Sequence, residues 1–395
     1  MSKDDILINL ASLGLISSLV FPFFSFFGFG LYLTSLISII LLFSVLFYNV
    51  RMGWLAILIF LLCLMVFVSS LYSNAFGLSV YNFANYLEAF KYFQYIPYLL
   101  IFYNVKKIIP LSFFLKYIYF AVLVYLVVFF LQLTNPLNLG YLISVFYLGG
   151  ASSPHLLGIE TGFRLPITGS NPNVGAVIGV FFSLFFLILF AYKRSKLALI
   201  IFLCCFISVF YTQSRTTLVA LIVALIFYAF LSKIKLIYKI LVPIFLGFSV
   251  FLLFKYMDLS YIVNGYEYAK EGDNSSVNAR LDTLDMAINV FHSSPIFGVG
   301  PSKEEYSTNF DSEYILILMR YGIVGSLIFF VFIFYLLVKG FRNRNNVAGL
   351  TLFLYTLATL VVMLTNNAYS GYQLMSITIL LYIIVYNDAK QKVKL

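Results

Sequence analysis

Charged residues, cysteine, histidine and tryptophan are all scarce in this sequence of 395 residues. Asp, Glu, Lys and Arg together make up 10% of the residues, which is too few to cover the surface of a soluble domain of this length. The three cysteines and two histidines show no spacing that predicts a disulfide or a metal site. Because no glycine-rich nucleotide loop is present, the sequence argues against ATP-driven transport by this chain alone.

Apolar residues account for 62% of the chain, and the mean hydropathy is +1.00, which predicts an integral membrane protein. The apolar runs are continuous rather than alternating, so we expect an all-α bundle and no β-barrel. The whole chain is predicted to form one transmembrane domain with about twelve helices. These spans are 6–24, 27–48, 54–72, 86–103, 111–133, 173–192, 197–211, 216–231, 237–256, 314–338, 348–364 and 374–386.

Basic residues predict the orientation of this bundle. With the N-terminus in the cytoplasm, 16 of the 25 Lys and Arg residues lie in the cytoplasmic tails and connections, and six lie on the outer side. The positive-inside rule therefore places both termini in the cytoplasm. The net charge of +10 is explained by this topology, and it requires no nucleic acid partner.

Two segments on the outer side of the membrane are longer than simple connections. Segment 134–172 is rich in Pro, Gly and Ser and is predicted to be irregular. It leads into a helix that Asn171 or Asn173 is placed to cap. Segment 257–312 is the largest, and within it an apolar stripe recurs at helical spacing, formed by Val277, Leu281, Leu284, Ile288 and Phe291. This pattern predicts an amphipathic helix against the membrane or the top of the bundle.

Three arginines, Arg164, Arg215 and Arg280, fall on this outer side, where basic residues are normally rare. Each has an ordinary structural explanation: a capped helix entry next to Arg164, a side chain that extends to the membrane surface for Arg215, and an exposed ion pair for Arg280. The alternative is that they bind an anion. Arginine offers paired donors to phosphate and keeps its charge, so a phosphate-containing ligand suits this set.

Ionisable residues are also predicted inside the membrane. Glu88 and Lys91 are three positions apart and share a helix face, so they can neutralise one another. Lys91 can equally assist a phosphate ligand in the outer half of the bundle. For Arg320, in the tenth predicted span, pairing with Glu88 and contact with substrate remain open alternatives.

Several short motifs together resemble the superfamily of O-antigen polymerases and O-antigen ligases. Asn-Pro-Asn at 171–173 follows an arginine, and Ser214-Arg215 begins a helix. Pro-Ile-Phe-Gly-Val-Gly at 295–300 follows the Arg280 helix, and Tyr321-Gly322-Ile-Val-Gly lies in the span after it. The resemblance covers about residues 164–325, and Arg164 precedes Gly175 by eleven positions, as in the outer loops of polymerases.

This resemblance implies a glycosyltransferase that works at the periplasmic face and needs no cofactor. Its partners would be donor and acceptor glycans linked to undecaprenyl pyrophosphate, membrane lipid, and a chain-length regulator protein. A polymerase would transfer the growing glycan onto the next lipid-linked repeat unit to build O-antigen or a similar surface polysaccharide. A ligase would transfer it onto lipid A core.

The resemblance also implies roles for individual residues. Arg164, Arg215 and Arg280 would bind the pyrophosphate, and a general base would accept the proton of the attacking hydroxyl. Ligases carry a histidine eleven positions before the helical glycine, and this sequence has Asp311 there, which favours a polymerase. Asp311, or the nearby Glu313, would then be the base, although Asp311 also suits a helix N-cap. The predicted substrate contacts are Asn171, Asn173, Ser214, Tyr314, Lys91 and Arg320.

A ligase is the nearest alternative function, and a flippase or secondary transporter of lipid-linked oligosaccharide is the alternative from another class. Transporters commonly show internal repeats and place charged residues at the midplane of the membrane. This chain shows no clear repeat, and its polar residues are concentrated in outer segments. The sequence therefore favours an enzyme over a transporter.

Overall fold

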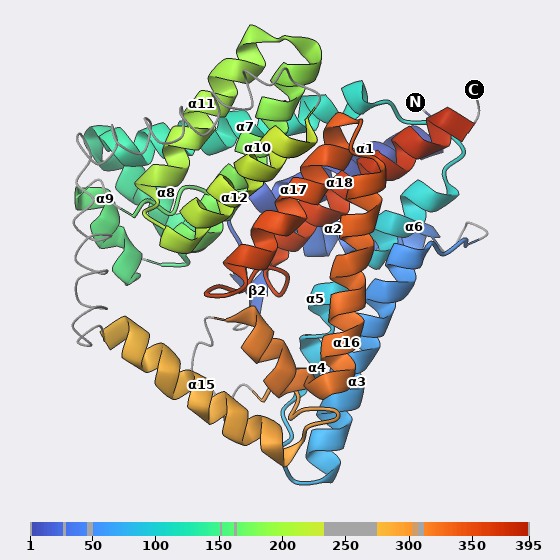
Figure 1. The fold of residues 1–395 in the computed structure, drawn as a ribbon, viewed down its shortest axis with the longest axis vertical. Helices are drawn as coiled ribbons and strands as arrows, with labels where there is room; N and C mark the ends of the chain where they lie inside the picture. Colours follow the sequence, from blue (N-terminus) through green and yellow to red (C-terminus); the bar gives the residue numbers. More distant parts are fainter. Residues whose placement is uncertain are drawn as a thin grey trace.

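The computed structural model describes residues 2–26, 29–45, 50–150, 152–161, 164–232, 275–302, 305 and 312–393. In this part of the chain nearly all regular structure is helical, and it forms one bundle (Figure 1). The helices are α1 (Lys3–Val20), α2 (Leu33–Val45), α3 (Trp54–Ala75), α4 (Phe83–Leu87), α5 (Phe90–Phe93), α6 (Ile96–Asn104), α7 (Leu111–Thr134), η1 (Pro136–Asn138), α8 (Leu139–Leu148), η2 (Pro154–Leu156), α9 (Leu157–Thr161), α10 (Pro172–Lys193), α11 (Lys196–Tyr211), α12 (Arg215–Leu231), α15 (Ser275–Ser293), α16 (Glu313–Arg342), α17 (Val347–Val362) and α18 (Tyr372–Val393).

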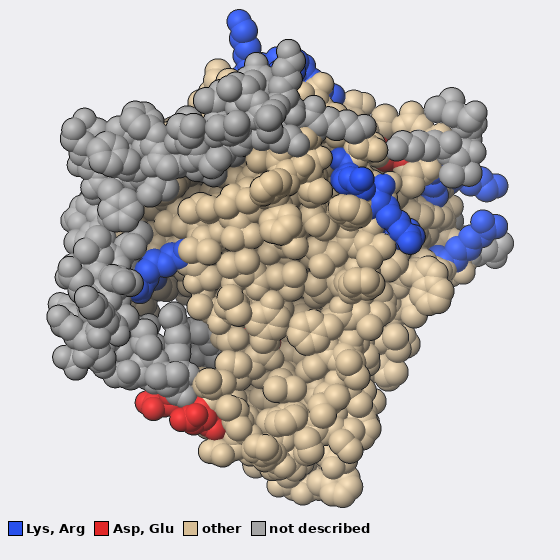
Figure 2. Space-filling model, viewed as in Figure 1, with Lys and Arg blue, Asp and Glu red and all other residues tan. Residues whose placement is uncertain are grey.

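Four of these helices, α3, α7, α10 and α16, are long and apolar enough to cross a membrane. The helical class is therefore confirmed, and these four helices are consistent with a membrane protein, while the number of twelve spans and the orientation stay predictions. The predicted span 237–256 lies outside the described residues, as do 257–274, 303–304 and 306–311 of the segment 257–312. Figure 2 shows a broad uncharged surface over α16, and several large apolar side chains of this helix are exposed, as lipid-facing residues are.

The N-terminal spans differ from the prediction at one junction. Helix α1 ends at Val20, two residues before Pro22, whose ring has no N–H to continue a helix. The chain then forms a short antiparallel hairpin of β1 (Phe24–Phe26) and β2 (Phe29–Leu31) before α2 begins. The second predicted span, 27–48, was therefore placed several residues too early.

Helix α10 lies at the centre of the bundle and contacts α11, α12, α17 and α18. The rings of Phe181, Phe182, Phe185 and Phe186 are completely buried, although they point to different sides of the helix. A helix that is apolar all round is stable only where other helices cover every side. The central position of α10 fixes the place of its N-terminus, which is important for the site described below.

Segment 134–172 is more ordered than the sequence predicts. Asn135 adopts a left-handed conformation that ends α7, and η1, α8, η2 and α9 follow. Helix α8 ends at Gly149, whose φ of 76° is a conformation that glycine adopts without steric cost. The expectation of an irregular segment was wrong because its glycines and prolines stand at the ends of short helices rather than replacing them.

The predicted span 86–103 is divided into α4, α5 and α6. At both junctions the chain keeps right-handed helical angles but changes to i→i−3 hydrogen bonds, such as Lys91 N–H to Glu88 C=O (3.1 Å). Glu88 lies between α4 and α5, so the tighter winding brings it and Lys91 onto the same side of the chain.

Helix α16 is interrupted at Gly322, which has a φ of 62°. The segment that follows α15 runs beside this interruption and supplies hydrogen bonds that the helix lacks. Pro295 and Ile296 accept from the N–H groups of residues 323 and 324 (2.9 and 3.2 Å), and residues 299 and 300 donate to the carbonyls of Met319 and Arg320 (3.2 and 2.8 Å). The Pro-Ile-Phe-Gly-Val-Gly motif is thus the structural complement of the glycine in α16.

Helix α15 confirms the amphipathic helix that was predicted after Ser275, but its buried face is different. Ala287 is buried with Met319 of α16, and Met286 and Val290 pack against the same cluster. Ile288, from the predicted apolar stripe, is 43% exposed. Helix α15 therefore packs on α16 through a face rotated from that stripe, and it runs obliquely below the main bundle (Figure 1).

The N-terminus of α1, the turn after α6 and the end of α18 meet on one side of the bundle (Figure 1). Lys107 binds Asp5 with an Nζ–Oδ1 distance of 2.5 Å. Lys390 donates to the carbonyl of Phe102 at 3.1 Å. These three segments were all predicted to be cytoplasmic, and their position together agrees with an even number of spans between them.

Candidate active site

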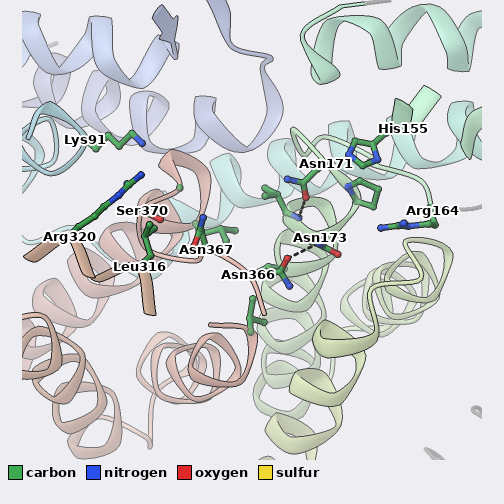
Figure 3. Close-up of a pocket in the computed structure, with 16 residues that line it drawn as sticks. Lys91, His155, Arg164, Asn171, Asn173, Leu316, Arg320, Asn366, Asn367 and Ser370 are labelled. Carbon is green, nitrogen blue, oxygen red and sulfur yellow. Dashed lines mark hydrogen bonds between the residues drawn. The ribbon is translucent and has the colours of Figure 1, made fainter. Parts of the chain in front are cut away.

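A cavity of about 560 Å³ opens at the N-terminus of α10, between the segment before this helix and the turn that joins α17 to α18 (Figure 3). Its walls come from parts of the sequence that are nearly 300 residues apart. The residues that line it are Lys91, His155, Arg164, Asn171, Pro172, Asn173, Val174, Val177, Leu316, Arg320, Val362, Asn366, Asn367, Ser370, Gly371 and Leu374.

The N-terminus of α10 forms one wall. The Asn171 side chain caps it by accepting from the Val174 N–H at 3.0 Å, and Pro172 occupies the first helical turn. Gly175 allows the chain to fold back on this turn, because a Cβ there would lie 2.1 Å from the Pro166 carbonyl oxygen. The partial positive charge of a helix N-terminus and its N–H groups favour an anion at this wall.

Two buried glutamines hold the segment that leads into α10. The amide of Gln132, on α7, accepts from the Ile167 N–H (2.8 Å) and donates to the Ile167 carbonyl (3.0 Å). Gln373, on α18, donates to the Thr168 carbonyl at 2.9 Å. Arg164 begins this segment with a φ of 52°. Its backbone is therefore fixed next to a well-anchored loop, and its side chain points into the cavity (Figure 3).

The opposite wall is the turn between α17 and α18, and Glu313 holds it. This side chain is completely buried, and its carboxylate accepts from three consecutive N–H groups, those of Ala368 (2.6 Å), Tyr369 (2.8 Å) and Ser370 (2.6 Å). The turn is joined to α10 by Asn173, whose Nδ2 donates to Asn366 Oδ1 at 2.6 Å. Glu313 is therefore a residue that shapes the cavity wall, and its oxygens are occupied by backbone donors.

Lys91 and Arg320 lie at the end of the cavity away from Arg164 (Figure 3). Lys91 Nζ is 2.7 Å from the carboxylate of Glu88, which is 4% exposed, so the predicted pairing of these two residues is confirmed. Arg320 stands just before the interruption of α16. Its Nε is buried and has no hydrogen-bond partner among the described residues.

Positive charge dominates the cavity. Lys91, Arg164 and Arg320 line it, and its described lining contains no Asp or Glu. His155 lies near Arg164, and burial together with the positive charge of Arg164 lowers the pKa of the imidazole below its usual value of 6.5. His155 is therefore neutral at pH 7 and can either donate or accept a hydrogen bond. The cavity as a whole is suited to an anionic ligand that also carries hydroxyl groups.

Residues 199–330 match the model of the family described as O-antigen ligase. This match supports membership of the O-antigen polymerase and ligase superfamily. A search of curated proteins finds no match for the chain.

The region similar to O-antigen ligases includes α12, α15, the 295–300 motif and the interrupted part of α16. Two cavity residues, Leu316 and Arg320, fall within it. The N-terminus of α10 and the α17–α18 turn lie outside it.

Of the ten residues predicted to form the site, five line this cavity: Arg164, Asn171, Asn173, Lys91 and Arg320. They come from α5, α16, the start of α10 and the segment before it, so the fold brings together residues that the sequence separates by up to 229 positions.

The remaining predicted residues lie elsewhere or outside the described side chains. Ser214 is buried, and its hydroxyl lies 2.8 Å from that of Thr217. Arg215 is the first residue of α12, next to Thr216, whose hydroxyl is 2.5 Å from that of Thr365 on the α17–α18 turn. Tyr314 donates to the Leu360 carbonyl at 2.8 Å. None of these three lines the cavity.

For Arg280, the structure describes the backbone position in α15 but not the side chain. Asp311 lies outside the described residues. The predicted roles of these two residues in binding and catalysis therefore stay predictions.

Asn366, Asn367 and Ser370 form much of the cavity wall and were not among the predicted site residues. A signal was present, because Thr365-Asn366-Asn367 is a polar run between two apolar spans on the predicted outer side. No role was predicted for His155 either, because two histidines are too few to indicate a metal cluster. The position of His155 beside Arg164 depends on how η2 and the segment before α10 fold together, and no local pattern predicts this.

Proposed function

We propose that this protein joins oligosaccharide repeat units linked to undecaprenyl pyrophosphate into O-antigen or a similar surface polysaccharide. The reaction would take place at the periplasmic face of the bacterial inner membrane. The observation that carries the proposal is the cationic cavity at the N-terminus of α10, in a chain that matches the O-antigen ligase family.

In this reaction a hydroxyl oxygen of the acceptor glycan forms a bond to the anomeric carbon of the donor. The bond from that carbon to the pyrophosphate oxygen breaks, and the pyrophosphate leaves with the electron pair. Negative charge grows on the leaving group, so fixed cations and helix N–H groups stabilise the transition state more than the ground state. Arg164 and the N-terminus of α10 are the groups that we assign to this task, with Arg215 and Arg280 as further predicted contacts.

The proton of the acceptor hydroxyl must pass to a base. Glu313 is unsuited to this role because its two oxygens already accept three backbone hydrogen bonds. Asp311 remains the proposed base. The neutral amides and hydroxyls of Asn366, Asn367 and Ser370 suit the recognition of sugar hydroxyl groups between the charged ends of the cavity.

The experiment that tests this function is incubation of the purified protein with lipid-linked repeat units and no nucleotide. We expect a ladder of longer lipid-linked glycans, because the donor already holds the energy of the reaction. Arg164→Gln should shorten or abolish the ladder, and Arg342→Gln, an exposed arginine at the other end of α16, serves as the control. If the wild-type protein yields no ladder from an authentic repeat unit, polymerase activity is refuted.

Because the matching model is described as O-antigen ligase, a ligase is the second candidate. A deletion strain separates the two activities. Loss of a polymerase leaves lipid A core that carries a single repeat unit, whereas loss of a ligase leaves core that carries none. Accumulation of repeat units on the inner side of the membrane would instead indicate a flippase.

A further inference from the structure

We infer that the cavity contains a second anion subsite, formed by Lys91 and Arg320, that binds an anionic group of the acceptor glycan. This inference rests on the proposed function, since it names how the same cavity holds a second substrate. Two parts of the acceptor can supply the anion: its own pyrophosphate, or a carboxylate on one of its sugars.

The cations of the cavity form two separate groups. Figure 3 shows Arg164 and His155 at one end of the cavity and Lys91 and Arg320 at the other, with Asn366 and other polar groups between them. The two ends are built by different elements, the segment before α10 and the pair α5 and α16. The cavity therefore presents two separate groups of cations with neutral polar side chains between them.

The Lys91–Arg320 end carries a net positive charge. Glu88 is 2.7 Å from Lys91 and neutralises one of the two positive charges, so one positive charge remains. Arg320 has a buried Nε with no hydrogen-bond partner in the described part of the chain. A buried donor without a partner is costly unless a ligand or water satisfies it. Since this side chain lines the cavity, an anionic ligand is the partner that satisfies both the donor and the remaining charge.

The two ends of the cavity differ in their electrostatic surroundings. Arg164 stands beside the N-terminus of α10, so this end combines a full charge with a helix dipole. That combination suits the leaving pyrophosphate, whose charge increases during the reaction. The Lys91–Arg320 end is partly neutralised by Glu88, which suits an anion whose charge does not change. We therefore assign the donor to the Arg164 end and the acceptor to the Lys91–Arg320 end.

Arg320 is held in place by its backbone. Its carbonyl oxygen accepts from the Gly300 N–H at 2.8 Å and lies 2.6 Å from the hydroxyl of Ser69 on α3. A Cβ on Gly298 would lie 2.4 Å from this carbonyl group, so only glycine permits the close approach. The α16 interruption, the 295–300 motif and α3 thus together fix the position from which the guanidinium enters the cavity.

The experiment compares acceptors with and without the anionic group, using the full-length protein in detergent. The donor is a lipid-pyrophosphate repeat unit whose acceptor hydroxyl has been removed, so it cannot act as an acceptor. One acceptor carries a phosphonate in which CH₂ replaces the anomeric oxygen, so it keeps the charge but cannot act as a donor. A second acceptor is the uncharged alkyl glycoside of the same glycan, and a third has its sugar carboxylates reduced to alcohols.

We expect the wild-type protein to prefer the charged acceptor, with a lower KM, over at least one of the two neutralised acceptors. Arg320→Gln should reduce this preference about tenfold or more, as expected for loss of a charged hydrogen bond. Arg320→Lys should keep part of the preference, and Arg342→Gln should keep all of it. Whichever neutralised acceptor the wild-type protein discriminates against identifies the source of the anion. If Arg320→Gln retains the full preference, the subsite assignment is wrong.

Lys91→Gln alone would leave Glu88 buried without its cation, so the double variant Glu88→Gln/Lys91→Gln is used in its place. This variant keeps the local net charge and removes only the hydrogen bond that Lys91 can donate to the ligand, so it should weaken the preference in the same direction as Arg320→Gln but by less. If Arg164→Gln removes the preference and both Lys91–Arg320 variants keep it, the donor and acceptor ends are reversed and the inference is overturned.

Binding of inorganic pyrophosphate, measured by calorimetry, separates the failure of this inference from the failure of the proposed function. We expect two binding events in the wild-type protein and one in Arg320→Gln. A single event in the wild-type protein overturns the second subsite even if a ladder forms. Two events without ladder formation would support the subsite and refute the polymerase.

Discussion

The three hydrogen bonds that Glu313 accepts from the α17–α18 turn allow a quantitative prediction. Glu313→Ala would leave the N–H groups of Ala368, Tyr369 and Ser370 without an acceptor. Each buried donor that loses a charged partner costs about 1–3 kcal/mol, so the upper limit is about 9 kcal/mol. The variant no longer has to bury a carboxylate, and this saving in desolvation free energy offsets part of the cost. The turn can also relax toward the cavity, so we expect a net loss in the free energy of unfolding of about 3–5 kcal/mol.

The assay is thermal unfolding of the purified protein in detergent, detected by light scattering or by labelling of the free cysteines as they become exposed. A loss of this size should lower the Tm by about 5–10 °C. Glu313→Gln should lose less, because its amide oxygen keeps one acceptor while its NH₂ group opposes the remaining donors. Glu160→Ala, an exposed glutamate of α9, is the control and should change the stability by no more than about 0.5 kcal/mol.

Activity gives a second measurement on the same variants. Because the turn forms a wall of the cavity, Glu313→Gln should raise the KM for lipid-linked substrate more than it lowers kcat. If Glu313 were the general base, its replacement would instead cause a large loss in kcat and abolish the dependence of kcat on pH that the base produces. An unchanged Tm together with an unchanged KM in Glu313→Ala would refute the assigned role.

Three further predictions concern single positions. Gly322→Ala should destabilise the protein by about 2 kcal/mol or more, measured by thermal unfolding, because φ is 62° and the new Cβ would lie 2.4 Å from the Ile296 carbonyl oxygen. Gly175→Ala should displace the N-terminus of α10, since its Cβ would lie 2.1 Å from the Pro166 carbonyl oxygen, and we expect the KM to rise more than the Tm falls. Because the folded state lowers the pKa of His155, the unfolded state binds more protons as the pH falls below 6.5, so stability should decrease there. The Tm difference between pH 7.5 and pH 5 should be smaller in His155→Gln than in the wild-type protein.

The sequence predicted the helical class, most helix positions and the cap of α10, because these depend on local patterns. Apolar runs of sufficient length predict helices in a membrane, and Asn171-Pro172 is a typical helix start. The interruption at Gly322 could not be predicted in this way. It depends on hydrogen bonds from the segment after α15, which lies more than twenty residues away in the sequence. For the same reason the sequence could not distinguish Glu313 as an anchor from Glu313 as a base.

The site was predicted in part. Arg164, Asn171 and Asn173 are close in the sequence and lie together in the cavity, so a local motif was sufficient for them. Lys91 and Arg320 were recognised as unusual charges inside spans, but only the packing of α5 near α16 brings them to the same cavity. The face of α15 was predicted incorrectly because a hydrophobic stripe can meet either lipid or protein. Ile288, which belongs to that stripe, is exposed.

The hydrogen bonds between the 295–300 segment and α16 have a mechanical consequence. Four backbone hydrogen bonds span the interruption, so α16 cannot rotate or slide at Gly322 unless the end of α15 moves with it. We therefore expect a displacement of the end of α15 to be transmitted to α16 at the position of Arg320. A spectroscopic probe attached to exposed Asp285 of α15 would report displacements of the wall that carries Arg320.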